Sequence, residues 1–329
     1  MKKVSWGVLS TARIGLNKVI PAMQKGKLSV VNAIASRDFT RANNEALKLE
    51  IPKAYGSYEE LLSDREIEAV YIPLPNHLHI EWIKKSLDAG KHVLCEKPIA
   101  LNFKQAEEIL RCSEKYPDQK LMEAFMYRFH PQWGEVKKLL SSGSIGEIQN
   151  VHSEFFYYNI NPKDIRNIAE FGGGGLLDIG CYCISISRLI FQDEPERVSG
   201  SVKLDSQMKT DKLTSGILEF KNGNATFTCS TQMHDRKFVG ITGSKGRIEI
   251  ENPFNPEPDQ SCKIVLYTGS SRNEILLDPC DQYTIQGDLF SEAILKNSPV
   301  PTPFSDALAN MKVIDGIFES ANRKKWIDL

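Results

Sequence analysis

The sequence predicts an α/β protein that begins with a doubly wound parallel sheet and continues into an α+β part with a large, mostly antiparallel open sheet. Up to about residue 122, short apolar strands alternate with helices, which is the order of a parallel sheet covered on both faces. After about residue 145, alternating apolar and polar runs follow one another without helices between them. A chain of 329 residues suits two domains, which we place at residues 1–122 and 123–329.

The individual elements follow from the apolar runs and their lengths. In the first part we expect strands at residues 4–9, 28–35, 69–72, 92–95 and 120–124, and helices at 16–25, 40–49, 58–62, 80–89 and 103–116. In the second part we expect strands at 148–156, 196–204, 214–220, 225–231, 238–242 and 247–251. Asn222-Gly223 separates two of these strands and predicts a tight hairpin.

Composition and charge argue against several classes of function. The chain carries 41 Lys and Arg against 42 Asp and Glu, and this balance gives no footprint for nucleic acid or an anionic membrane. No apolar run approaches the roughly 20 residues of a membrane helix, and the N-terminal segment is typical of a first strand, not of a signal peptide. Seven cysteines without regular spacing predict reduced thiols in the cytoplasm. The six histidines form no metal-binding motif, and we assign no metal.

Lys97 lies just beyond the end of a buried strand. The apolar run at residues 92–95 ends abruptly in Glu96-Lys97-Pro98. Ligands of doubly wound sheets bind beyond the carboxyl ends of the strands, and Pro98 keeps Lys97 in an extended or turn conformation. Lys97 is therefore well placed to act on a bound ligand. Taken alone, the same tripeptide also describes a surface lysine paired with Glu96.

The turn after the first strand resembles a phosphate-binding loop only in part. A dinucleotide-binding sheet carries GxGxxG here, so that backbone amides can approach a pyrophosphate at a helix N-terminus. The chain has only the last of these glycines, Gly15. Small residues at positions 10 and 12 still allow a phosphate group to approach the backbone closely. The candidate cofactor residues are Ser10, Thr11, Ala12, Arg13, Ile14 and Gly15. By itself this segment is a weak signal.

The end of the second strand bears on the choice of nucleotide. NAD enzymes place an acid there for the ribose hydroxyls, whereas NADP enzymes place arginine near the extra phosphate. Ser36, Arg37 and Arg41 supply a hydroxyl and two guanidinium groups, which favours NADP over NAD. Asp38 could instead hold a ribose or cap the next helix, and the two arginines could be solvated charges at a helix start.

Four consecutive glycines, residues 172–175, precede an apolar run of helical length. Glycines lose much conformational entropy on folding, so a run of four lowers stability. It is expected where another group must approach the backbone closely. Asp178 and Tyr182 lie four residues apart and would share one face of the first helical turns. A tyrosine near a lysine ammonium can exchange protons near neutral pH. Taken separately, Asp178 could be a charge at a helix N-terminus and Tyr182 an ordinary semi-buried aromatic residue. Together with Lys97 they predict a hydride-transfer site.

Four stretches carry a resemblance to a known family: residues 70–79 (VYIPLPNHLH), 89–100 (AGKHVLCEKPIA), 122–131 (MEAFMYRFHP) and 172–183 (GGGGLLDIGCYC). In this order they resemble the Gfo/Idh/MocA oxidoreductases, from the first strand to about residue 250. The third stretch and Tyr182 are most similar to the subgroup of dimeric dihydrodiol dehydrogenase, NADP xylose dehydrogenase and glucose–fructose oxidoreductase. The incomplete glycine loop is the main departure. The resemblance implies a Rossmann-type first domain and NADP, or otherwise NAD, as cofactor.

The resemblance also implies roles for single residues. Lys97 would anchor the substrate and the nicotinamide ribose, Tyr182 would exchange the proton with the substrate oxygen, and Asp178 would orient the substrate. Arg128 and Arg166 are candidates for lining the substrate pocket, although a structural ion pair would explain either arginine equally well. The resemblance also implies cofactor contacts in the loops after the third and fourth strands, at Pro73, Leu74, Asn76, His79 and Glu96. It further implies a cis peptide bond at Pro98.

The expected reaction transfers a hydride between nicotinamide and a secondary alcohol or carbonyl of a sugar, polyol or diol, in a cleft between the two domains. Two alternatives remain open: an NAD-dependent glycosidase that oxidises its sugar transiently, and a dinucleotide sensor without turnover. A sensor would be expected to have lost Lys97 or Tyr182, and both are present. The open antiparallel sheet also predicts a homodimer or homotetramer. We expect no nucleic-acid or membrane partner.

Overall fold

The computed structural model describes residues 2–329, which form two compact units. The first unit contains the residues up to Met126 together with Asp281–Leu308. The second unit contains Tyr127–Cys280 and Ala309–Leu329. The chain thus leaves the first unit, builds the second, and returns to the first before it ends in the second. The division into a dinucleotide-binding domain at residues 1–122 and a substrate-binding and oligomerisation domain at residues 123–329 stays a prediction.

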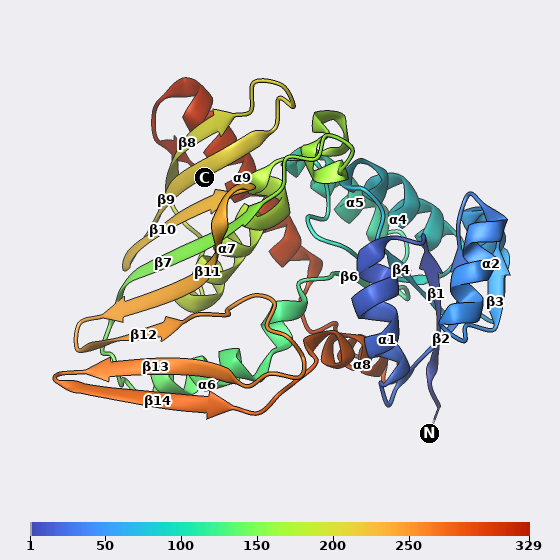
Figure 1. Cartoon of the computed structure of the whole chain (residues 1–329), viewed down its shortest axis with the longest axis horizontal. Coiled ribbons are helices and arrows are strands. Elements are labelled where there is room, and N and C mark those ends of the chain that lie inside the picture. Colours follow the sequence, from blue (N-terminus) through green and yellow to red (C-terminus); the bar gives the residue numbers. More distant parts are fainter. Residues whose placement is uncertain (1) are drawn as a thin grey trace. The chain divides into compact units, whose positions relative to one another are not determined.

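The first unit is built on a six-stranded sheet. Its strands are β1 Val4–Leu9, β2 Ser29–Ala35, β3 Lys53–Tyr55, β4 Ala69–Ile72, β5 His92–Cys95 and β6 Leu121–Glu123. Their order is β3-β2-β1-β4-β5-β6 and every neighbouring pair is parallel (Figure 1). This order confirms the predicted doubly wound sheet, in which ligands bind where the strand order reverses, at β1 and β4. The edge strand β3 is missing from the prediction because its three residues are only half-buried and form no apolar run.

Helices cover both faces of this sheet. They are α1 Ile20–Gln24, α2 Phe39–Lys48, α3 Tyr58–Ser63, α4 His79–Asp88, α5 Phe103–Ser113 and α8 Gln282–Leu295. On one face, Trp6 of β1 donates its indole N–H to Ser291 of α8 at 3.1 Å. The next residue of β1, Gly7, points to the other face, where Leu61 of α3 lies against it. Helix α8 therefore belongs to the first unit although it lies far along the chain.

The second unit is built on a nine-stranded sheet. Its strands are β7 Ile148–Tyr158, β8 Arg197–Leu204, β9 Asp211–Phe220, β10 Gly223–Ser230, β11 Gln232–Gly243, β12 Gly246–Ile250, β13 Cys262–Thr268, β14 Ser271–Leu277 and β15 Ile327–Asp328. Their order is β14-β13-β12-β11-β7-β10-β9-β8-β15, and all neighbours are antiparallel except β7 and β10. The predicted antiparallel sheet and the hairpin at Asn222-Gly223, which joins β9 to β10, are confirmed. Strands β13 to β15 were not predicted.

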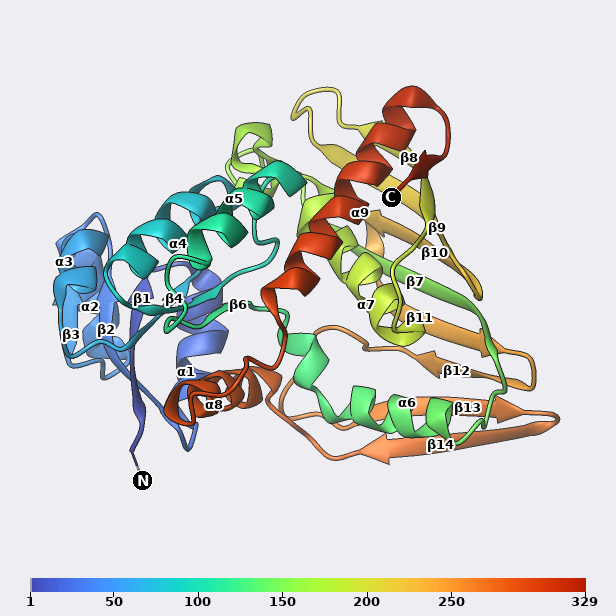
Figure 2. The same ribbon diagram turned by 180° about the vertical axis from the view of Figure 1, so that it is seen from behind.

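Three helices lie on one face of the nine-stranded sheet (Figure 2). They are α6 Pro131–Ser141, α7 Cys181–Phe191 and the part of α9 Phe304–Arg323 that belongs to this unit. Ile317 of α9 fits so closely that a Cβ atom at Gly200 of β8 would lie 2.8 Å from it. The helical stretch Ala169–Phe191 is long and apolar enough to cross a membrane, but 83% of its most apolar window is buried inside the fold. It is therefore accounted for as a core helix.

Candidate functional site

The turn after β1 forms a helix N-terminus at the carboxyl end of the parallel sheet. Helical residues begin at Arg13 and continue through a π-helical turn, Gly15–Val19, into α1. Ser10 takes the first position of the turn with a φ of 143°, a conformation that favours glycine. Its hydroxyl accepts from the amide of Ala12 at 2.9 Å and donates to the carbonyl of Pro73 at 3.3 Å, which compensates part of the backbone strain. A methyl group at Gly15 would lie 3.5 Å from Pro73, so the packing leaves room for one.

The end of β2 places two guanidinium groups close to this turn. Arg41 donates to the carbonyl of Thr11 at 3.1 Å, and both Arg37 and Arg41 lie near enough to Tyr58 to lower its pKa, against the larger raising effect of burial. Asp38 caps α2, accepting from the amide of Arg41 at 3.2 Å, so its carboxylate serves as a helix cap. Ser36 lies buried beside it and accepts from the amide of Asp38 at 3.3 Å. The two guanidinium groups are donors that suit an anion, whereas the Asp38 carboxylate accepts a hydrogen bond as the helix cap.

A buried histidine connects the loops after β4 and β5. The ring nitrogens of His79 lie 2.8 Å from the carbonyl oxygen of Leu74 and 2.9 Å from that of Pro98. Burial lowers the pKa of His79 to about 4, although the two carbonyls act in the opposite direction. Asn76 opens the short 3-10 turn between β4 and α4. The predicted cofactor loop is therefore tied directly to the segment that follows Lys97.

Lys97 lies two residues beyond the end of β5 and is half-buried. The peptide bond that joins it to Pro98 is cis, as the family resemblance implies. Glu96 accepts the hydroxyl proton of Tyr71 at 2.6 Å, and burial together with the charge of Glu96 raises the pKa of that tyrosine well above its usual value. Tyr71 is therefore a permanent donor that fixes the Glu96 carboxylate. The turn after β1 and the loops after β4 and β5 thus converge at one edge of the sheet.

In the second unit, the glycine run is fixed by other parts of the same chain. Gly174 has a φ of +124°, and a Cβ atom there would lie 2.0 Å from the carboxylate of Asp211. A Cβ atom at Gly173 would lie 2.6 Å from the carbonyl oxygen of Arg166. The expected close approach to these glycines is therefore made, at these two positions, by Asp211 and the Arg166 backbone. The run leads into a π-helical turn, Leu176–Gly180, that carries Asp178.

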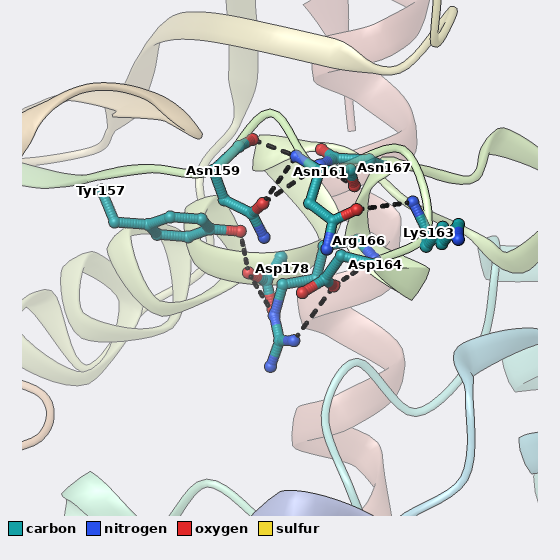
Figure 3. Close-up of polar contacts among 8 residues, drawn as sticks. All are labelled: Tyr157, Asn159, Asn161, Lys163, Asp164, Arg166, Asn167 and Asp178. Carbon is teal, nitrogen blue, oxygen red and sulfur yellow. Dashed lines mark hydrogen bonds and ion pairs between the residues drawn. The ribbon is translucent and has the colours of Figure 1, made fainter.

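Asp178, in the π-helical turn, is the centre of a polar cluster with Tyr157 of β7 and with Asp164 and Arg166 of the loop after β7 (Figure 3). Its Oδ2 atom accepts from the hydroxyl of Tyr157 at 2.7 Å and lies 3.2 Å from Nε of Arg166. Arg166 also reaches Asp164 at 3.3 Å, and its side chain is 45% exposed. The charge of Asp178 raises the pKa of Arg166, while burial and the same charge raise that of Tyr157. A carboxylate, a guanidinium group and a protonated phenol together can bind hydroxyl and carbonyl oxygens.

Tyr182 lies in the first turn of α7, one helical turn beyond Asp178, and its side chain is buried. Its ring contacts Tyr127, Phe155 and Phe254, with centroid distances of 5.5 to 5.7 Å. These aromatic contacts fix the direction of the phenol ring. Arg128 is half-buried in the 3-10 turn that precedes α6. The structure thus brings Arg166 and Asp178 together directly and places Tyr182 on the adjoining turn.

Two family models match the chain. Residues 4–125 match the oxidoreductase family GFO_IDH_MocA with its NAD-binding Rossmann fold, and residues 133–249 match the GFO/IDH/MocA C-terminal domain. The chain belongs to the GFO/IDH/MocA oxidoreductase family. The predicted resemblance is confirmed, and the protein is an NAD(P)-dependent oxidoreductase.

Relatives in this family include enzymes that act on sugars and diols. A D-xylose 1-dehydrogenase (NADP(+)) 2 from Haloferax volcanii is 36% identical over 98% of this chain and 99% of its own. A trans-1,2-dihydrobenzene-1,2-diol dehydrogenase from Xenopus laevis is 38% identical over 74% of each chain. The fold matches the crystal structure of a 3-ketoreductase from Actinomadura kijaniata in complex with NADP and TDP-benzene, with a TM-score of 0.92 and 29% identity over 97% of this chain and 98% of that one.

The residues of the first unit fit a dinucleotide. The helix that begins at Arg13 presents its N-terminus at the carboxyl edge of the sheet, where first-turn amides favour phosphate groups. Arg37 and Arg41 add positive charge at the end of β2. When bound, the nicotinamide group supplies or accepts the hydride. The individual site assignments stay predictions.

Three polar residues with a place in this geometry were not predicted: Tyr71, Tyr157 and Asp211. Tyr71 lies within a buried strand, and Tyr157 lies in a strand whose alternation shows only which face it takes. Their partners are 25 and 21 residues away in sequence. An alternating pattern predicts the face of a side chain and not its partner, so the sequence offered no signal for these pairs.

Proposed function

We propose that this oxidoreductase prefers NADP and transfers a hydride between nicotinamide and a secondary alcohol or carbonyl of a sugar, polyol or diol. The observation that carries this proposal is the cluster of Asp178, Arg166 and Tyr157 beside the turn of Tyr182. Such a cluster suits a substrate rich in hydroxyl groups, because each of its members can donate to or accept from a hydroxyl. The relatives that use D-xylose and a dihydrodiol support the same substrate class.

In the proposed reaction, each residue has a separate task. Tyr182 exchanges the proton with the substrate oxygen, and Lys97 stabilises negative charge on that oxygen or on the tyrosinate. Asp178 orients the substrate hydroxyls, with Arg166 and Tyr157 holding its carboxylate. Arg128 is a further candidate for the substrate pocket. Tyr157 is unsuited to the proton transfer, because its pKa lies far above neutrality.

Cofactor preference is the second part of the proposal. Arg37 and Arg41 bind the 2′-phosphate of NADP, and Ser36 adds a hydroxyl, while Asp38 is occupied as a helix cap. Ser10 to Gly15 receive the pyrophosphate, and the loops of Pro73, Leu74, Asn76, His79 and Glu96 contact the remainder of the cofactor. The similar D-xylose dehydrogenase from Haloferax volcanii uses NADP(+), and the similar 3-ketoreductase structure contains NADP, which supports this preference.

The test is a screen of aldoses, inositols, linear polyols and trans-diols with NADP and with NAD, followed by the absorbance of the reduced nicotinamide. Deuterium-labelled NADPH should deliver its label to the matching carbonyl substrate. We expect turnover with members of one of these classes and a higher kcat/KM with NADP. Cleavage of a nitrophenyl glycoside without net nicotinamide reduction would identify a glycosidase instead, and tight cofactor binding without any turnover would identify a sensor.

We also propose a homodimer or homotetramer in the cytoplasm, formed through the nine-stranded sheet. No helix of the second unit lies over the opposite face of this sheet within the described residues (Figures 1 and 2). Ile217 of β9 alternates with inward residues that face the helices, and it is 41% exposed. Light scattering after gel filtration should show an oligomer that Ile217→Asp weakens.

A further inference from the structure

Asp211, the first residue of β9, has a buried carboxylate directly beneath the glycine run. The residue is only 3% exposed. Its Oδ2 atom accepts from the amide of Leu176 at 2.7 Å and from the hydroxyl of Thr214 at 2.8 Å. The amide of Gly175 is a further donor. Within residues 2–329, the donors that the structure gives this carboxylate are all uncharged, so hydrogen bonds alone compensate its burial.

The peptide segment held by Asp211 is the one that connects Asp178 to Arg166. The carbonyl of Gly174 accepts from the amide of Asp178 at 3.1 Å. The amide of Gly174 donates to the carbonyl of Arg166 at 2.9 Å. The backbones of Asp178 and Arg166, which form the ion pair, are therefore both hydrogen-bonded to the backbone of Gly174. Gly174 in turn lies against the Asp211 carboxylate. A shift of this peptide would move both of them.

The fit at Gly174 shows how tightly the two parts are matched. A Cβ atom at this position would lie 2.0 Å from Oδ1 of Asp211, and the residue has a φ of +124°. Any other residue there would collide with the carboxylate and also strain the backbone. Gly174 therefore packs directly against Asp211, which is held in place by strand β9.

We propose that Asp211 is a positioning residue for the proposed reaction, which holds residues 174–176 so that Asp178, Arg166 and the turn of Tyr182 keep their geometry. It contacts none of the three side chains through its carboxylate in the described structure and acts through the backbone. Only the expected effect on turnover rests on the proposed function. The expected effect on the backbone of residues 172–180 can be measured without a substrate.

Burial also raises the pKa of Asp211 to about 6, with Thr214 and the backbone amides opposing the shift. The groups that face this carboxylate are the amides of Gly175 and Leu176, the hydroxyl of Thr214, and the buried thiol of Cys229, whose own pKa is raised chiefly by burial. Below its pKa, the carboxyl gains a proton and one acceptor oxygen becomes a donor that faces backbone amides. The positioning contact should therefore weaken as the pH falls through about 6.

The test compares Asp211→Asn with a matched control, Asp205→Asn. Asp205 also accepts two backbone amides, from Gln207 and Met208 at 2.9 and 3.0 Å, but it lies in the neighbouring turn and does not touch the glycine run. Hydrogen–deuterium exchange of the peptide that covers residues 172–180 should rise about tenfold in Asp211→Asn, the change expected from losing roughly one buried hydrogen bond. It should stay unchanged in Asp205→Asn.

With the substrate found by the screen, kcat of Asp211→Asn should fall about tenfold while the KM for NADP stays constant, and the activity loss near pH 6 should disappear from its pH profile. Thr214→Val, which removes one donor and keeps the carboxylate, should show a smaller change in exchange of the same sign. Unchanged exchange at 172–180 in Asp211→Asn, or an equal change in Asp205→Asn, would overturn the proposal. A wild-type protein without any turnover would refute the proposed function and leave the exchange test of Asp211 intact.

Discussion

Tyr157 donates its hydroxyl proton to Asp178 across 2.7 Å, and the oxygen that accepts it also lies 3.2 Å from Nε of Arg166. One carboxylate oxygen thus holds a phenol and a guanidinium group at once. Burial and the charge of Asp178 keep the pKa of Tyr157 far above neutrality, so this tyrosine is a fixed donor. The relationship separates the two tyrosines: Tyr157 fixes a carboxylate, and Tyr182 is the tyrosine that we propose for the proton exchange.

The first prediction concerns this fixed donor. Tyr157→Phe removes the hydrogen bond to Asp178 and leaves the ion pair of its carboxylate with Arg166 in place. We expect the KM for the polyol or sugar substrate to rise about tenfold, with a smaller loss in kcat, because a charged acceptor loses one buried partner. Tyr158→Phe is the matched control, since the neighbouring tyrosine is 65% exposed. Steady-state kinetics of both variants decide it, and equal KM values would contradict the role of Tyr157.

The second prediction concerns the proton exchange. Tyr182→Phe and Lys97→Ala should each lower turnover roughly a hundredfold or more, which is the usual contribution of a positioned acid or base. NADPH binding, followed by fluorescence titration, should be largely retained. Lys104→Ala, at an exposed lysine of α5, should leave both quantities unchanged. Stopped-flow detection of normal hydride transfer in Tyr182→Phe would remove this residue from the mechanism.

The third prediction concerns cofactor choice. In the wild type, the guanidinium group of Arg41 donates to the carbonyl of Thr11 and carries a second positive charge beside Arg37. Arg41→Ala removes this group. We expect the Kd for NADP to rise about tenfold or more, because a charge-assisted hydrogen bond to a phosphate is worth roughly 1.5–3 kcal/mol. The Kd for NAD should change little. Lys48→Ala, at the other end of α2, is the control. A parallel loss for both nucleotides would assign Arg41 to the loop structure instead.

The fourth prediction concerns His79 and pH. Its pKa is lowered from 6.5 to about 4, chiefly by burial, with the charges of Lys97 and His77 acting in the same direction. The unfolded chain therefore binds a proton at a higher pH than the folded protein. The corresponding stability is present above pH 6.5 and is lost as the pH falls through about 4, by roughly 3 kcal/mol in all. Denaturant unfolding at a series of pH values measures it.

His79→Gln supplies the comparison for this measurement. Glutamine cannot titrate, so the difference in unfolding free energy between wild type and variant should shrink as the pH falls from 6.5 to 4. A difference that stays constant over this range would show that His79 keeps an ordinary pKa in the folded protein. The ring nitrogen shifts of His79 in an NMR titration would report the same value independently.

Much of the fold could be predicted from the sequence because it depends on local patterns. Alternating strands and helices predicted the parallel sheet, and period-two runs predicted the antiparallel one. The placement of Lys97 also followed, because a residue that ends a buried strand of a parallel sheet must lie at its carboxyl edge. Strand β3 and strands β13 to β15 were missed, the first for want of an apolar run.

The sequence by itself determined which strands form the parallel sheet, where Lys97 lies along it, and which family motifs the chain carries. The tertiary structure alone decided that Tyr71 holds Glu96, that Tyr157 and Arg166 hold Asp178, and that Asp211 lies against Gly174. The reason is physical. A periodic pattern specifies the face and the end of an element, whereas the partner of a buried polar group depends on where the chain returns after 12 or more residues.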